Sequence, residues 1–133
     1  MSEVDFGPAK LAIPDGWNET GREGERITFL SDDKLEHVTI SYRHFPRNPS
    51  FAEFEALCEQ RLTTERGALD DGFNLIFFGG DRATARMFSG LLIVVVDTLL
   101  AIYVEGFDME PARHQQSFMA FAQGWSLIPR SAS

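Results

Sequence analysis

The segment formed by residues 89–106, SGLLIVVVDTLLAIYVEG, is the most apolar part of the chain and most limits what the chain can fold into. A membrane-spanning helix needs roughly 20 consecutive apolar residues. Only 14 residues separate Gly90 from Glu105, and Asp97 and Thr98 interrupt them. An aspartate at the centre of a spanning helix costs about 2.5–3.5 kcal/mol, and the Val and Ile residues of the first half favour strands. The segment therefore predicts β-strands, and the chain is not predicted to be an integral membrane protein.

Turn residues and hydrophobic periodicity divide the rest of the chain into short elements. Pro14 and Gly16 mark a turn, after which Trp17 is expected to fold back onto the edge of the core. Ser50 and Glu53 form a capping box before a helical pattern. The predicted elements are strands 10–13, 26–30 and 36–45, a helix from 50 to 67, strands 73–78, 82–88, 91–96 and 99–104, and a helix from 111 to 124. Residues 18–25, 79–81, 89–90 and 97–98 are predicted to be loops or turns.

The order of these elements, β-β-β-α-β-β-β-β-α, favours an α+β fold, in which an antiparallel β-sheet of about six to seven strands carries two helices packed on it. Residues 1–133 are predicted to form one domain, with a core of about residues 9–125 and a tail of residues 126–133. The buried face of the last helix is expected to comprise Ala112, Gln115, Phe118, Met119, Ala122 and Trp125.

Charge and cysteine content restrict the partners. The net charge is -8, which disfavours nucleic acid because a phosphate backbone would be repelled. The acidity suits a basic or apolar protein partner, although it also serves simple solubility. The single cysteine, Cys58, allows no intrachain disulfide, and the acidic N-terminus lacks the basic start of a signal peptide. The chain is therefore expected to be cytoplasmic.

The apolar strands raise the question of what covers them. An antiparallel sheet usually has one dry face, and two helices cover only one face, yet strands 91–96 and 99–104 are apolar on both. Loops of a curled sheet, a homodimer or an apolar segment of another protein are the alternatives for covering the second face. If even positions face outward, the candidate partner-binding residues are Ile76, Phe78, Leu92, Val94, Val96, Leu100 and Ile102, and Asp97 is added to them as a residue at the rim. Asp97 is either a turn residue or a carboxylate at the rim of this face.

Few residues indicate catalysis or metal binding. His37 and His44 differ by an odd number on one strand and face opposite sides, and His114 is expected to be exposed on the last helix. Cys58 lies on an apolar helical stripe and reads as a buried thiol. We therefore predict no catalytic residue, no metal and no cofactor, and the chain is not predicted to be an enzyme.

The run Ile13-Pro14-Asp15-Gly16-Trp17 after a first strand, together with the element order, resembles the PsbP/DcrB-like superfamily over roughly residues 9–125. Within it, the size, acidity and lack of a signal peptide are most similar to cytoplasmic Eag-type chaperones of bacterial type VI secretion. The short loop at 68–71 departs from that pattern. The resemblance implies a homodimer that holds apolar segments of secreted toxins before export, with no catalytic residue.

The leading hypothesis is thus a non-enzymatic chaperone or adaptor for a secreted effector, which holds an apolar segment on an open sheet face. The alternative is an immunity protein that binds and blocks a toxin, where the acidic surface matters more. A small hydrolase or isomerase using acidic residues near Trp17 would need a deep pocket with convergent polar groups.

Overall fold

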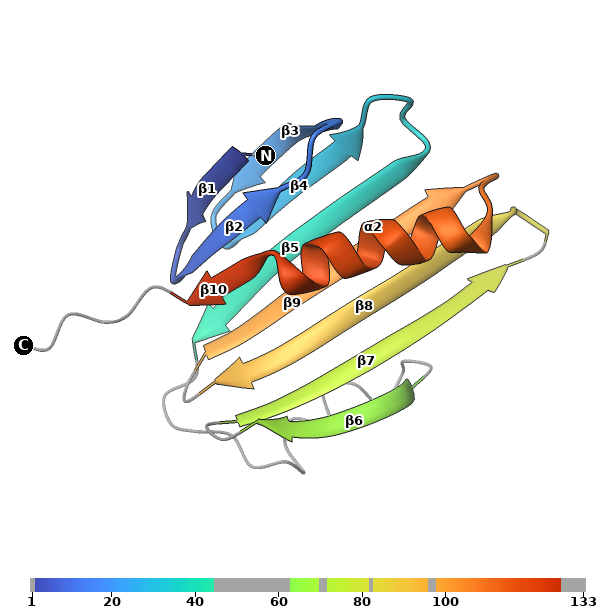
Figure 1. Ribbon diagram of the computed structural model, residues 1–133. Helices are drawn as coiled ribbons and strands as arrows, with labels where there is room; N and C mark the ends of the chain where they lie inside the picture. The colour runs from blue at the N-terminus through green and yellow to red at the C-terminus, as the bar shows by residue number, and fades with distance from the viewer. Residues whose placement is uncertain (1, 45–62, 70–71, 82, 96–97, 128–133) are drawn as a thin grey trace, which may run out of the picture.

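The computed structural model describes residues 2–44, 63–69, 72–81, 83–95 and 98–127, which form two antiparallel sheets and one helix (Figure 1). The strands are β1 (Ser2–Phe6), β2 (Ala9–Ile13), β3 (Trp17–Glu23), β4 (Arg26–Ser31), β5 (Glu36–His44), β6 (Thr63–Leu69), β7 (Gly72–Asp81), β8 (Arg86–Val95), β9 (Thr98–Phe107) and β10 (Trp125–Leu127). The helix is α2 (Pro111–Gln123). No helix among these residues is long and apolar enough to cross a membrane.

Two layers build the fold. The larger sheet has seven strands in the order β3-β4-β5-β9-β8-β7-β6, and the smaller one has three in the order β1-β2-β10. Helix α2 lies along β8 and β9 on one face of the larger sheet, and the smaller sheet lies beside it (Figure 1). We call this covered side the α2 face and the other side the far face.

The core lies between the two layers because alternate residues of each strand point to the α2 face. The larger sheet contributes Ile27, Phe29, Val38, Ile40, Leu91, Ile93, Leu100, Ile102 and Val104. The smaller sheet adds Phe6, Ala9, Leu11 and Ile13, and α2 adds Phe118 and Phe121. Val38, Ile40 and Tyr42 share one face of β5, as the alternation of that strand predicts.

The turn at Pro14 and Gly16 is confirmed. Gly16 has φ +87°, a conformation that glycine adopts without strain. It reverses the chain so that the ring of Trp17 packs edge-on against Phe121, with ring centroids 4.9 Å apart. The turn therefore places the first residue of β3, in the larger sheet, against the C-terminal end of α2.

Several predicted boundaries are wrong. Residues 18–25 are mostly strand β3 rather than loop, because β4 supplies the backbone partners that this polar segment cannot signal alone. Residues 89–90 do not turn: β8 continues through them, and Gly90 pairs with both Phe77 and Tyr103. Strand β7 likewise runs on to Asp81, so the turn falls at 83–85, where Ala85 has φ +53°.

The predicted α+β class agrees with the structure, but the two predicted helices and the predicted order of elements are not confirmed. Residues 63–67, predicted to be helical, belong to β6, which pairs with β7. The remainder of that predicted helix lies outside the described residues. The predicted tail begins instead with β10, which pairs with β2, and the N-terminal strand β1 was not predicted.

Helix α2 begins with Pro111 and ends before Gly124, as predicted, but its buried face differs. The buried residues are His114, Phe118 and Phe121. Met119 is exposed, as are Ala112 and Gln115, so these three were wrongly assigned to the core.

Candidate functional site

The residues predicted to bind a partner do not form one surface. Leu100 and Ile102 are each only 1% exposed and belong to the core, so neither side chain presents a surface. Leu92 and Val94 point to the far face, opposite Ala101 and Leu99 respectively, and Val94 is buried there at 1% exposure.

Ile76 and Phe78 instead lie on the α2 face. They pair with Leu91 and Ser89 of β8, which point toward the helix. Val96 and Asp97 lie outside the described residues, so their partner-binding role stays a prediction. Of the described members of the predicted set, Leu92 and Val94 thus share the far face, and Ile76 and Phe78 line a pocket beside α2.

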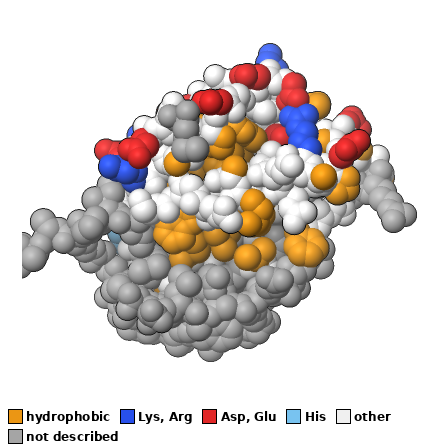
Figure 2. Space-filling view, viewed as in Figure 1, with side chains coloured by type: hydrophobic (Ala, Val, Ile, Leu, Met, Phe, Trp, Pro, Cys, Tyr) orange, Lys and Arg blue, Asp and Glu red, His pale blue; other side chains and the backbone are white. Residues whose placement is uncertain are grey.

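An apolar groove of about 460 Å³ lies between α2 and strands β7 and β8, and we take it as the candidate site. Its apolar lining includes Ile76, Phe78, Met87, Phe118 and Met119. Phe78 is 55% exposed and Met119 is 41% exposed, which makes them two of the three exposed large hydrophobic side chains among the described residues. Figure 2 shows hydrophobic side chains gathered at the surface on the β7–β8 side of α2. Exposed apolar groups that cluster in a groove are typical of a binding site.

The solvent-exposed surface of α2 borders this groove and carries no charged side chain. Its exposed residues are Pro111, Ala112, Gln115, Gln116, Met119, Ala120 and Gln123. The charged residue of the helix, Arg113, turns toward the sheet and reaches Glu36. Because the centres of protein interfaces are depleted in charge, an uncharged helix surface on a chain of net charge -8 marks this side as suited to contact.

A polar network anchors α2 beside the groove. Glu36, only 2% exposed, accepts hydrogen bonds at Oε1 from Nε of Arg113 at 3.0 Å and from Oγ of Ser117 at 2.9 Å. Arg113 also forms an ion pair with Asp33 at 2.7 Å. The hydrogen bond from the Leu35 amide, followed by those from Ser31 and Arg113, lowers the pKa of the Asp33 carboxyl.

His114 forms part of the groove wall, although the sequence analysis expected it to be exposed. It is buried at 6% exposure, and its Nε2 lies 2.8 Å from Oγ of Ser89. Burial lowers the pKa of His114, and the nearby Glu36 charge opposes that shift. The spacing of His114, Phe118 and Phe121, i, i+4 and i+7, was the signal that could have placed this histidine on the buried stripe.

Ser89, His114 and Glu36 are the residue types of a nucleophile, a base and an orienting carboxylate, but Nδ1 of His114 makes no hydrogen bond and is therefore not oriented by Glu36. Ser89 is, moreover, only 7% exposed and lies in the middle of β8, between β7 and β9. Strand pairing on both sides engages the backbone N–H groups that would otherwise stabilise an oxyanion. This arrangement therefore favours a structural role, and the described residues contain no group of three or more metal-ligating side chains.

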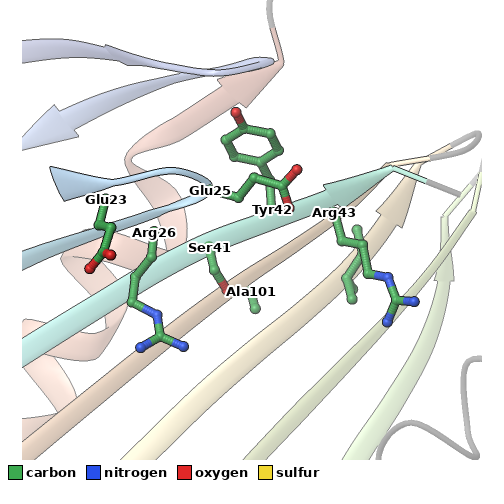
Figure 3. A pocket seen from close by; sticks show the side chains of 8 residues that line it. Glu23, Glu25, Arg26, Ser41, Tyr42, Arg43 and Ala101 are labelled. Carbon is green, nitrogen blue, oxygen red and sulfur yellow. The ribbon is translucent and has the colours of Figure 1, made fainter.

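The far face offers a more polar hollow of about 610 Å³ (Figure 3). Arg26, Ser41 and Ala101 lie in one row across β4, β5 and β9, and Glu23 and Arg43 flank them. Figure 3 shows the side chains of Arg26 and Arg43 extending to the same side of the sheet. The mixture of both charge signs suits an apolar segment less well than the groove does.

A second polar cluster lies further along the far face. Nε of Arg86 is 2.6 Å from Oε2 of Glu105, and the Tyr103 hydroxyl contacts both side chains. Burial raises the pKa of Tyr103, while the guanidinium of Arg86 lies over the ring of Phe88 at 4.8 Å. The far face is therefore not the continuous apolar surface that the sequence predicted.

Comparisons with known proteins give a fold but no family. No protein-family model matches the chain, and no curated protein sequence matches it. The solution structure of cyanobacterial PsbP (CyanoP) from Synechocystis sp. PCC 6803 is similar, with a TM-score of 0.69 and 10% sequence identity over 96% of this chain and 92% of that one. A crystal structure from Bacteroides thetaiotaomicron has a TM-score of 0.58 and 11% identity, and the match covers 97% of this chain but only 48% of that one. These likenesses establish a PsbP-like fold for this chain.

Proposed function

We propose that this chain is a protein-binding domain that holds an apolar segment of a partner in the groove beside α2. The supporting observation is the joint exposure of Phe78 and Met119 in a groove bordered by an uncharged helix surface. In this proposal the partner is a secreted bacterial effector and the chain is its cytoplasmic chaperone or adaptor, acting as a homodimer and without catalysis.

The energetics set the strength of such binding. Covering the exposed parts of two large apolar side chains contributes on the order of 2–3 kcal/mol. Association costs at least several kcal/mol, so the partner also has to contact Ile76, Met87 and the outer surface of α2. A partner that covers only the two exposed side chains would not bind stably. A client helix held loosely along the whole groove meets both needs of a chaperone, because it is shielded from water and can still leave.

The decisive experiment places the photo-cross-linking amino acid p-benzoylphenylalanine at Phe78 and, as a control, at Phe107. Phe107 is the third exposed large hydrophobic residue, at 37%, and does not line the groove. In cells of the native organism we expect irradiation to join the Phe78 variant to a protein with an apolar segment, and the Phe107 variant to give no such product. Cross-links confined to the chain itself, or equal products from both sites, would refute the groove as a binding site.

The alternative of an immunity protein predicts a different partner and a different salt response. A toxin bound through the acidic surface should dissociate sharply between low and high salt, whereas an apolar client in the groove should not. Co-expression separates the two further: a chaperone increases the soluble amount of its partner, and an immunity protein abolishes the partner's toxicity.

A further inference from the structure

His114 occupies an unusual place beneath α2. A Cβ added at Gly106 of β9 would lie 3.5 Å from Nδ1 of His114. Gly106 is the direct cross-strand partner of Glu36, and Ser89 bonds the opposite side of the imidazole. The ring therefore lies over β9, between a buried carboxylate on β5 and a hydroxyl on β8.

Two polar atoms at this place have no hydrogen-bond partner. Nδ1 of His114 and Oε2 of Glu36 are both buried and unbonded. Leaving a buried polar atom without a partner costs about 1–3 kcal/mol. The His114 ring thus has one nitrogen engaged and one nitrogen available for a proton.

Among the described residues, few charged groups lie near the ring. Helix α2 supplies Arg113, β5 supplies Glu36, and the turn between β4 and β5 supplies Asp33. The groups from β8 and β9 that contact this part of α2, Ser89 and Gly106, are uncharged. The Glu36 carboxylate already accepts bonds at Oε1 from Ser117 and from the partly exposed Arg113, so a buried imidazolium would share this counter-ion with Arg113.

We infer that protonation of His114 regulates the groove: the charged imidazolium favours a state in which α2 lifts from the sheet, and a bound apolar segment is then released. This inference rests on the proposed function, because His114 belongs to the same groove as Phe78 and Met119. An imidazolium is unfavourable among apolar side chains when its counter-ion is shared with another cation. Water solvates the charged ring better, and the ring reaches water when α2 lifts from the sheet.

The pKa of His114 gives the direction of the response. Because burial holds this pKa below the ordinary histidine value of about 6.5, the state with α2 lifted binds more protons than the docked state. Docking is therefore strongest above about pH 6.5 and weakens as the pH falls toward the depressed value. At pH 5.5 the linkage lowers the docking equilibrium by up to about tenfold.

The test uses a capped, uncharged 20-residue helical peptide of Leu, Ala and Gln as the probe, so that only the protein titrates. We expect the wild-type dissociation constant to rise between pH 7.5 and 5.5, by at most about tenfold, because the apparent affinity follows the docked fraction. His114→Gln keeps a group able to bond Ser89 and should bind the peptide equally at both pH values. His37→Gln, on the far face of β5, is the matched control and should behave as wild type.

Hydrogen exchange of the α2 amides, corrected for its intrinsic pH dependence, gives a readout that needs no ligand. Protection should fall at pH 5.5 in the wild type and stay constant in His114→Gln. Equal protection at both pH values, or an NMR titration that places the His114 pKa at or above the ordinary value, would overturn the inference. If the peptide binds at neither pH while exchange responds as expected, the regulation of α2 stands and the proposed function fails.

Discussion

Replacing Leu100 by alanine should destabilise the chain far more than replacing its neighbour Leu99. The two residues are chemically identical and adjacent on β9, but they point to opposite faces of the sheet. Leu100 is 1% exposed in the core, whereas Leu99 is partly exposed on the far face opposite Val94. The pair therefore measures which parity of β9 faces the core.

The magnitudes follow from burial. A buried Leu→Ala substitution costs about 2–5 kcal/mol, because apolar burial is lost and a cavity remains. At Leu99 the same three carbons would contribute at most about 2.4 kcal/mol if fully buried, at about 0.8 kcal/mol each. Their partial exposure reduces this to roughly 1 kcal/mol.

Urea unfolding followed by tryptophan fluorescence suits the comparison, because Trp17 and Trp125 both pack against the core. We expect Leu100→Ala to lose at least about 1.5 kcal/mol more than Leu99→Ala, with similar slopes against denaturant. Equal losses, or a larger loss at Leu99, would show that the even positions of β9 do not face the core and would restore Leu100 as a candidate contact residue.

Two further substitutions test local features of the same fold. Gly7→Ala should destabilise the chain more than Gly24→Ala. The backbone strain is similar at the two positions, because their φ angles are +55° and +56°. A Cβ at Gly7 would, however, overlap the ring of Tyr42, whereas a Cβ at Gly24 has no atom within 4 Å. Thermal unfolding of both variants measures the difference, and equal melting temperatures would rule out the ring contact. Glu36→Gln should cost roughly 1–3 kcal/mol in urea unfolding, because Arg113 loses a buried charged acceptor; no loss would show that this bond does not hold α2 in place.

The sequence predicted the structure correctly where a single residue type determines the local backbone conformation. Pro111 and Gly124 bound α2, and Gly16 with its positive φ makes the turn before Trp17. The alternation of β5 predicts its inner face because its outer face is polar. In each case the signal lies within a few residues of the feature it predicts.

The sequence-based predictions were wrong or undecided where the structure of a segment depends on pairing with a strand elsewhere in the chain. Strand β3 is largely exposed and carries no hydrophobic period, so only its pairing with β4 makes it a strand. Gly90 reads as a turn residue, yet it lies between two paired strands. Both parities of β9 are apolar, so the sequence did not determine which one would face the core.

The groove itself could not be predicted because it combines three segments that are far apart in the chain. Phe78 comes from β7, Met87 from β8 and Met119 from α2. The periodicity of α2 does contain the stripe of His114, Phe118 and Phe121, but histidine is intermediate between buried and exposed residue types, so its identity did not place it in the core. If His114 had been assigned to the buried face of α2, Met119 would have been assigned to the exposed face. The sequence would then have predicted an exposed apolar side chain beside the sheet.

The dimensions of the layers explain why the groove lies at β7 and β8. Seven strands about 4.8 Å apart span about 29 Å between the first and the last. On the α2 face, the smaller sheet and α2 cover only part of this width, because β10 continues α2 end to end and pairs with β2 (Figure 1). The smaller sheet is tied to the β3–β4 side, because Arg22 of β3 donates a hydrogen bond to the Asp5 carbonyl of β1. The part of the α2 face that these elements leave uncovered therefore lies beyond α2, where Phe78 is exposed.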